Sequence, residues 1–338
     1  MNHQPPHEHD RDDHLMNGQE SAAPLRLGTR RSALAMAQSG MVARDVTRVT
    51  GRAVELVEIT TYGDTSREAL AQIGGTGVFV SALRDALLDG RIDFAVHSLK
   101  DLPTATPEGL LLAAVPERED PRDALVARDG LGLGELVEKL AGRTARIGTG
   151  SPRRMAQLNA WARARGAALE TVAIRGNVDT RIGFVHSGEL DAVVLATAGL
   201  NRLGRSAEIT EHLDAELMLP APGQGALAIE CVDPVLAAAL GALDHAPTRA
   251  AVVAERALLA TLEAGCSAPV AALAKWAGAE MWLEGVVGTV DGATLLKMTA
   301  NGPLVLDETV ERQATALGRA LAVRLLDGGA ATLMGERA

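Results

Sequence analysis

The sequence LRLGTRRSALAMAQ at residues 25–38 is echoed by ARIGTGSPRRMAQL at residues 145–158. Each stretch begins with a short apolar run typical of a strand, passes through a Gly-Thr turn, and enters a helix near paired arginines. RIDFAVHSLKDL at residues 91–102 is echoed in the same way by ELDAVVLATAGL at residues 189–200. The echo predicts two α/β lobes of one construction. Since ligand sites tend to lie between such units, it also predicts a cleft between the lobes.

Strands and helices alternate through both predicted lobes, which is typical of a largely parallel sheet. The expected strands are residues 25–28, 53–61, 93–98, 111–116, 124–127, 145–150, 171–176 and 191–197. The expected helices are residues 32–50, 78–90, 151–166 and 177–188, with a further helix that opens at residue 197.

The pattern changes after LPAPGQGALAIECVD at residues 219–233. Residues 234–265 are expected to be helical, and residues 281–288 and 294–302 alternate as antiparallel strands do. A final amphipathic helix is expected at residues 314–330. This order predicts a separate α+β domain toward the C-terminus.

Length and composition restrict the class of protein. A chain of 338 residues suggests two or three domains. Two cysteines form no disulfide framework, which favours a reducing, cytoplasmic location. The sequence contains neither an apolar run long enough for a membrane helix nor the pattern of a signal peptide, which agrees with that location. A net charge of −10 disfavours nucleic acid as a partner. Locally clustered arginines on an acidic chain instead point to a small anionic ligand.

Histidines gather in the polar segment at residues 1–23, which we expect to be a disordered tail. They are His3, His7, His9 and His14. Without an accompanying cysteine they make a weak metal site, and neither HExxH, paired CxxC nor GxSxG occurs. We therefore expect no metal. His97, within a predicted strand, is expected to be a hydrogen-bonded core histidine, and Asp93 to lie at the structural end of that strand.

Paired arginines stand at the start of two predicted helices. A helix N-terminus already carries partial positive charge, so added arginines are unfavourable there unless an anion binds. Guanidinium groups, hydroxyls and backbone N–H groups would together suit a carboxylate or a phosphate. Arginines simply solvated at the surface are the alternative. The residues concerned are Thr29, Arg30, Arg31, Ser32, Thr149, Ser151, Arg153 and Arg154.

Further charged residues follow predicted strands. Arg175, Arg181 and Arg202 lie at or beyond the carboxyl ends of strands, where open α/β sheets place ligands. Lys100 and Asp101 end another strand in the same way, and a carboxylate there can accept N–H bonds and stabilise a cation. Taken singly, each of these residues is also explained as a solvated or structural side chain.

Cys266 lies in the segment EAGCSAPV, among small residues. Small neighbours leave room for a bulky group to approach the thiol or to be attached to it. A buried structural thiol is the alternative, because free cysteine behaves as a small hydrophobe.

Nine segments, in order, resemble the porphobilinogen deaminase (hydroxymethylbilane synthase) family over about residues 25–335. They are LGTRRSALAMAQ, GGTGVF, DFAVHSLKDLP, REDPRDALV, IGTGSPRRMAQL, IRGNVDTR, LATAGLNRLG, LPAPGQGALAIEC and LEAGCSAPV. The resemblance implies a transferase that condenses four porphobilinogen molecules head to tail with loss of ammonia, and then releases hydroxymethylbilane by hydrolysis.

The resemblance also implies a dipyrromethane cofactor attached through a thioether to Cys266, with Cys231 structural. It places the catalytic aspartate at Asp101, beside Lys100. The implied cofactor-binding residues are Arg30, Ser32, Lys100, Asp101, Thr149, Ser151, Arg153, Arg154, Arg175 and Gly176. The implied substrate-binding residues are Arg30, Gln38, Arg175, Arg181 and Arg202. Arg31 is not among the implied residues, because relatives often lack a basic residue there.

The fold implied is α/β, with two periplasmic-binding-protein-like lobes around a cleft plus a C-terminal α+β domain, in a monomer. Domain 1 is expected at residues 24–118 and 222–243, domain 2 at 119–221 and domain 3 at 244–338. The alternative from another class is a two-lobe solute-binding or effector-binding protein without catalysis.

The chain departs from the family pattern in two places. Gln72, Thr76 and Ser81 stand where many relatives have lysines, so the resemblance does not imply a cationic lid over the growing chain. Gly150, Ser151 and Pro152 replace a Ser-Ser-Leu segment, which removes one hydroxyl but keeps the arginines.

Overall fold

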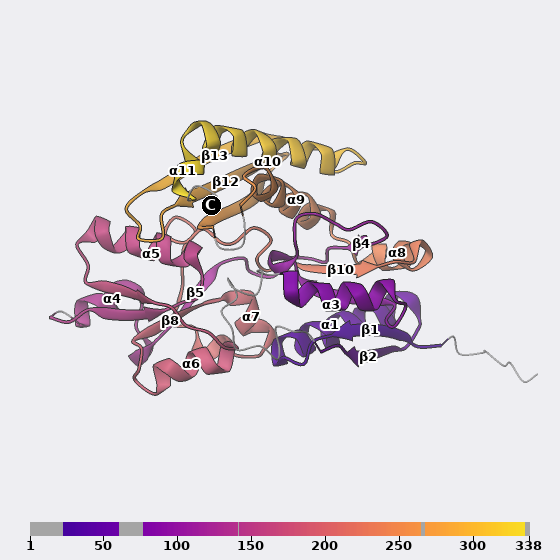
Figure 1. The fold of residues 1–338 in the computed structure, drawn as a ribbon, viewed down its shortest axis with the longest axis horizontal. Helices are drawn as coiled ribbons and strands as arrows, with labels where there is room; N and C mark the ends of the chain where they lie inside the picture. The colour runs from indigo at the N-terminus through magenta and orange to yellow at the C-terminus, as the bar shows by residue number, and fades with distance from the viewer. Residues whose placement is uncertain (1–22, 61–76, 141, 265–267, 335–338) are drawn as a thin grey trace, which may run out of the picture.

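A computed structural model of the chain describes residues 23–60, 77–140, 142–264 and 268–334. Figure 1 shows one α/β lobe mostly in indigo and purple, with its later elements β10 and α8 in salmon, a second lobe in magenta and pink, and a third domain in orange and yellow that lies above both. Most of the predicted tail, the segment with Gln72 and Thr76, and Cys266 lie outside the described residues. No helix in the described part is long and apolar enough to span a membrane.

The first lobe contains a five-stranded sheet in the order β2-β1-β3-β10-β4. Its strands are β1 (Leu25–Thr29), β2 (Val54–Glu58), β3 (Phe94–Ser98), β4 (Leu111–Ala114) and β10 (Leu227–Cys231). β1 runs parallel to β2 and β3, whereas β10 is antiparallel to β3 and β4.

Helices cover both faces of this sheet because side chains alternate along each strand. One face of the sheet packs against α1 (Ala33–Thr50) and α8 (Pro234–Leu240), and the other against α3 (Gly77–Leu88). Ser32 begins α1 by accepting a hydrogen bond from the N–H of Ala35, 3.3 Å away. Gly51 ends α1 in the left-handed conformation that favours glycine (φ 69°).

The second lobe repeats the plan in the order β7-β6-β8-β5-β9. Its strands are β5 (Asp123–Ala127), β6 (Ala145–Gly148), β7 (Leu169–Val172), β8 (Ala192–Ala196) and β9 (Glu211–His212). Helices α4 (Leu133–Lys139) and α5 (Pro152–Arg165) cover one face, while α6 (Val178–His186) and α7 (Thr197–Arg202) cover the other.

The two sheets confirm the internal echo, and they correct one expectation. In each lobe the fourth strand is reversed: β10 in the first and β5 in the second. The sheets are therefore mixed: in each, four strands run in one direction and the reversed strand is antiparallel to both of its neighbours. The reversal arises because the chain crosses between the lobes twice, at residues 115–122 and 213–226, and lays a strand on the far sheet after each crossing.

The third domain is a three-stranded antiparallel sheet covered by two long helices, which confirms the α+β prediction. It contains α9 (Ala246–Thr261), β11 (Val270–Ala277), β12 (Glu280–Gly288), β13 (Leu295–Pro303), α10 (Val310–Asp327) and α11 (Ala330–Leu333). α9 and α10 cross closely at Gly318, where an added Cβ would lie 2.2 Å from the carbonyl oxygen of Ala254.

Two local predictions were wrong, and some elements were not predicted. The expected helix at residues 234–265 is broken: α8 ends at Leu240, a 3-10 turn follows, and α9 starts afresh at Ala246 with Pro247 in its first turn. The strand expected at residues 171–176 ends at Val172. Helix α4 and strands β9 and β11 were not predicted at all.

Candidate active site

The site begins at a tight turn after β3. The strand ends at Ser98 and the chain forms a 3-10 turn, Leu99–Asp101, closed by a hydrogen bond from the N–H of Leu102 to the carbonyl of Leu99 (3.1 Å). Leu99 and Leu102 are buried, so the turn is anchored by its apolar side chains. Between them Lys100 is half-buried and Asp101 is exposed. The predicted catalytic carboxylate is thus open to solvent on an anchored backbone.

Lys100 reaches toward the second lobe. Its Nζ donates a hydrogen bond to Oε1 of Gln224, 3.2 Å away. Burial lowers the pKa of Lys100 to about 8; Asp101 opposes this shift, and Arg154 adds to it. Interaction with Arg154 means that Lys100 and the helix start of α5 belong to one electrostatic cluster that spans both lobes.

Arg153 and Arg154 are held by a carboxylate that was not predicted. Asp123, at the start of β5, is completely buried, with Oδ2 2.8 Å from Nη1 of Arg153 and Oδ1 2.7 Å from Nη2 of Arg154. Burial raises the pKa of Asp123, but the two guanidinium groups outweigh burial and hold it below its usual value. The paired arginines are therefore buried and anchored rather than exposed at the helix start.

Gln224 joins the two halves of the cluster. Its Nε2 donates to Asp123 (2.9 Å) and to the carbonyl of Pro121 (2.8 Å), so its Oε1 is left for Lys100. Gly223 and Gly225 flank it with φ of 74° and 88°. An added Cβ on Gly225 would lie 2.4 Å from the carbonyl oxygen of Glu119. The bend in the crossing at residues 213–226 therefore requires glycine at this position.

A buried ion pair fixes the two crossings to the third domain. The guanidinium of Arg118 donates to both carboxylate oxygens of Glu255 on α9 (2.6 and 3.0 Å) and to the carbonyl of Gln224 (2.7 Å). Glu255 also accepts from the backbone N–H groups of Gly223 and Ala274. Because every acceptor position of this carboxylate is occupied, both crossings have a defined geometry at Gln224.

Arg175 and Arg181 form a second cationic group next to Arg154, and Gly176 forms the turn that follows Arg175. Gly176 has φ of 110°, and an added Cβ would lie 2.7 Å from Thr180, so the turn needs glycine. Nε of Arg181 donates to the carbonyl of Gly176 (2.9 Å). Burial, and then the charges of Arg154 and Arg175, lower the pKa of Arg181. The effect of these charges on Arg181 indicates that Arg154, Arg175 and Arg181 lie close together.

The first-lobe residues lie around the end of β3 and the start of α1. Gln38 is buried, and its Nε2 donates to Oγ of Ser98 (3.1 Å), two residues before Lys100. Ser32 is occupied as the N-cap of α1. Arg31 pairs with Glu58 at the surface (2.7 Å), whereas Arg30 is half-buried.

The hydroxyl residues of the second lobe lie at the start of α5. Thr149 is buried, and its Oγ1 accepts a hydrogen bond from the N–H of Ser151 (3.2 Å). Ser151 is the N-cap residue of α5, but its side chain makes no capping bond. Pro152 occupies the first turn of the helix. A hydroxyl at a helix start that does not cap the helix is available to a ligand.

Arg202 is placed apart from the other arginines. Its Nη2 donates to the carbonyl of Gly225 (2.6 Å), and burial lowers its pKa, with Glu119 opposing. It lines a cavity of about 540 Å³ beside α1 and the crossing at residues 116–119. Its contacts connect it to the crossings rather than to Lys100.

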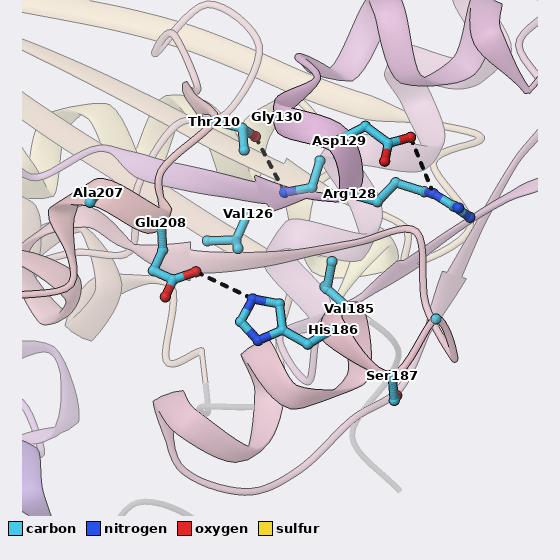
Figure 2. Close-up of a pocket in the computed structure, with 12 residues that line it drawn as sticks. Val126, Arg128, Asp129, Gly130, Val185, His186, Ser187, Ala207, Glu208 and Thr210 are labelled. Atoms are coloured by element: carbon cyan, nitrogen blue, oxygen red, sulfur yellow. Dashed lines mark hydrogen bonds and ion pairs between the residues drawn. The ribbon is translucent and has the colours of Figure 1, made fainter.

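A second cavity, of about 530 Å³, lies at the far end of β5 from Asp123. Figure 2 shows its charged walls, where His186 faces Glu208 (3.4 Å) and Arg128 pairs with Asp129 (3.6 Å). None of the predicted site residues lines it.

The other cysteine and histidine candidates in the described part of the chain lie outside this site. Cys231 is buried, and burial raises the pKa of its thiol to about 11, which fits the structural role expected for it. His97 is buried, as expected of a core histidine, and its Nε2 lies 3.1 Å from Oε2 of Glu230 without meeting the geometry of a hydrogen bond. Among the described residues no group of three or more His, Cys, Asp or Glu side chains could hold a metal ion.

The residues present fit a ligand with many carboxylates. Lys100, Arg154, Arg175 and Arg181 interact in one cluster. Nε of Arg153 is buried without a hydrogen-bond partner in the described part of the chain, which leaves a donor for an anion. A buried donor is costly unless it is paired, so the arrangement is suited to a polyanionic group.

Sequence reasoning gave no role to the residues that assemble this cluster, namely Asp123, Gln224, Arg118 and Glu255. Two signals were available. Gln224 is a polar residue between two glycines in an apolar segment, and Asp123 directly precedes an apolar strand.

Two family models match the chain. Residues 25–235 match the model described as "Porphobilinogen deaminase, dipyromethane cofactor binding domain". Residues 249–327 match "Porphobilinogen deaminase, C-terminal domain".

Several curated proteins are similar over nearly the whole chain. "Porphobilinogen deaminase 1" of Streptomyces avermitilis is 68% identical, over 94% of this chain and 99% of that protein. "Porphobilinogen deaminase 1" of Streptomyces coelicolor is 67% identical, over 93% and 98% of the two chains. "Porphobilinogen deaminase" of Thermobifida fusca is 52% identical, over 94% and 98%.

The similarity to solved structures is much lower. The ligand-binding component of an ABC-type import system from Staphylococcus aureus covers 89% of this chain and 92% of its own, with a TM-score of 0.37 and 10% identity. The periplasmic aliphatic sulphonate binding protein from Escherichia coli covers 72% and 71%, with a TM-score of 0.35 and 13% identity.

Proposed function

The chain belongs to the porphobilinogen deaminase family and is a hydroxymethylbilane synthase, and on this premise we propose which of its residues carry out the reaction. The enzyme joins four porphobilinogen molecules head to tail, releases ammonia at each step, and frees hydroxymethylbilane with water. Its cofactor is dipyrromethane, as predicted. When bound, that group supplies the pyrrole end to which the first substrate is joined.

Asp101 is the catalytic residue of this proposal. Departure of ammonia leaves positive charge on the substrate pyrrole, and a fixed carboxylate stabilises that charge as it develops. The same carboxylate can take up or return a proton at a pyrrole nitrogen. Support comes from its placement: Asp101 is exposed on an anchored turn, next to the cluster that spans the lobes.

The cationic residues bind the acetate and propionate groups of cofactor and substrate. Arg153 and Lys100 supply donors at the junction of the lobes, and Arg175 and Arg181 extend the positive charge along the second lobe. Guanidinium groups keep their protons at neutral pH and form charge-assisted bonds with carboxylates. The other members of the proposed binding set are Arg30, Ser32, Gln38, Thr149, Ser151, Arg154, Gly176 and Arg202.

The cross-lobe contact from Lys100 through Gln224 to Asp123 is the observation that carries this assignment. It supports the proposal because it links Lys100, which lies on the proposed catalytic turn, to the carboxylate that binds the second-lobe arginines. Cys266, outside the described residues, is proposed as the point of thioether attachment.

Substitution of Asp101 tests the assignment. Asp101→Asn keeps the size of the side chain but removes its charge, so turnover falls by roughly 10²–10⁴-fold while folding is retained. Asp93→Asn is the matched control, because Asp93 lies at the opposite end of β3 and binds Arg26. Turnover of Asp101→Asn within a few-fold of wild type would remove Asp101 from the mechanism.

Domain boundaries are proposed at residues 24–118 with 222–243, 119–221 and 244–338. Sheet membership supports them, since β10 lies in the first sheet although it follows the second lobe in sequence. We also propose that the enzyme is a cytoplasmic monomer that does not bind nucleic acid. The net charge of −10 supports the last point.

A further inference from the structure

Arg256 lies on α9 of the third domain and reaches the catalytic turn of the first lobe. Its Nη1 donates to the carbonyl oxygens of Leu99 (3.3 Å) and Leu102 (2.8 Å), and its Nη2 donates to that of Pro103 (2.7 Å). These carbonyls lie on either side of Asp101 in the sequence. One guanidinium therefore binds the backbone before and after the catalytic carboxylate.

The partners of Arg256 are unusual for a desolvated cation. Burial lowers the pKa of Arg256 to about 10; Arg84 adds to this shift and Glu230 opposes it. Glu230 itself is bound by both Arg84 and His97. Among the described residues, Arg256 has no carboxylate within ion-pairing distance. Burying a cation against carbonyls alone costs free energy. The contact is therefore better explained by its fixing the backbone around Asp101 than by a contribution to the stability of the fold.

The turn needs such support. A single 3-10 turn has poor hydrogen-bond geometry and ends in carbonyl groups without partners in the turn. Arg256 satisfies the carbonyls of Leu102 and Pro103, and adds a second hydrogen bond to that of Leu99, as a cationic side chain does at the end of a helix. Val252, one helical turn earlier on α9, belongs to the same buried cluster as Leu99 and Leu102. The turn is thus held by one face of α9, through an apolar and a polar contact.

The same helix leads to the proposed attachment point. α9 ends at Thr261, and Cys266 follows ten residues after Arg256 in the sequence. The element that holds the Asp101 turn is therefore the one that precedes the tether.

We propose that Arg256 is a positioning residue that fixes the Asp101 turn relative to the third domain, and so sets the distance between the catalytic carboxylate and the tethered chain. This inference rests on the proposed roles of Asp101 and Cys266. Arg256 acts through Asp101 and does not itself contact the reacting atoms.

The first arm of the test removes the contact. Arg256→Met keeps an unbranched apolar stem but loses the hydrogen bonds. We expect it to retain the cofactor mass while kcat falls by roughly 10- to 100-fold and KM changes little, because small displacements of a catalytic group have effects of this size. Arg256→Lys, which keeps the charge and one donor, restores part of kcat. If Arg256→Met fails to fold, Arg256→Lys takes its place with a smaller loss.

Arg249→Met is the matched control. Arg249 lies two turns earlier on α9 and also binds first-lobe carbonyls, those of Leu112 and Ala113, together with Asp244. Its loss removes a similar anchor between the third domain and the first lobe, away from the catalytic turn. We expect a lowered Tm with kcat within about twofold of wild type, since no group near the reacting atoms moves.

The second arm separates positioning from a general structural effect. In the Asp101→Asn background, Arg256→Met should add less than about a twofold loss, because residues that act as a unit are not additive. Single-turnover growth of the tethered chain, followed by intact mass, gives this rate even for slow variants. An equal loss in both backgrounds, or no loss in the single variant, would overturn the inference alone. Near-normal turnover of Asp101→Asn would overturn both it and the proposed function.

Discussion

Lys100 and Gln224 lie 3.2 Å apart, and through this hydrogen bond a lysine of the first lobe is joined to the crossing that leads back from the second. Gln224 has no freedom to turn its amide, since its NH₂ group is bound to Asp123 and to the carbonyl of Pro121. Its oxygen therefore faces Lys100. The relationship gives the enzyme a cation whose position depends on both lobes.

The pKa of Lys100 predicts how activity changes at alkaline pH. Since burial lowers it to about 8, the lysine loses its charge as the pH rises through 8, and carboxylate binding weakens. Lys100→Arg keeps the charge, so the alkaline limb of its kcat/KM profile should move to higher pH. An alkaline limb at the same pH in both enzymes would assign that limb to another group.

Asp123→Asn should destabilise the fold. The substitution leaves the buried guanidiniums of Arg153 and Arg154 without their counter-charge, which typically costs about 3–5 kcal/mol. Asp129→Asn, at an exposed ion pair with Lys139, should cost no more than about 1 kcal/mol. Urea unfolding of the two variants measures the difference, and equal midpoints would show that Asp123 is not the anchor of the arginines.

We expect the ionisation of Glu230 to account for part of the loss of folding stability at acidic pH. Burial raises its pKa, but the hydrogen bonds from Arg84 and the close approach of His97 outweigh burial and lower the pKa from 4.5 to about 2. A carboxylate with a lowered folded pKa contributes stability above pH 4.5, and this contribution is lost as the pH falls toward 2. The contribution is on the order of 3 kcal/mol.

Glu230→Gln tests this contribution by urea unfolding at a series of pH values. The variant should be less stable than wild type near pH 6, and the gap should narrow between pH 4.5 and 2. A gap that stays constant across that window would mean that Glu230 has no lowered pKa in the folded state.

The repeated architecture of the lobes could be predicted because it depends on local sequence patterns. The strands and helices around residues 25–38 and 145–158 each follow from periodicity, turn residues and helix caps. The reversed direction of β5 and β10 could not be predicted in this way. It depends on the two crossings between the lobes, and strand direction leaves no mark on the apolar pattern of a buried strand.

The site was predicted unevenly for a related reason. Paired arginines at a helix start indicated an anion, but their partner Asp123 lies about 30 residues earlier, on another element. Gln224 and Arg256 make their contacts with residues more than a hundred positions away. Such contacts depend on the packing of three domains. The residue types reveal which chemistry is present, whereas the assembled fold decides which groups meet.

The most direct measurement is the intact mass of the freshly purified enzyme and of its Cys266→Ser variant, both made in a tetrapyrrole-producing host. We predict that the active wild type carries the added mass of two porphobilinogen-derived units, and that the variant lacks it and is inactive. A fully active wild type with an unmodified chain mass would contradict the tethered-cofactor account.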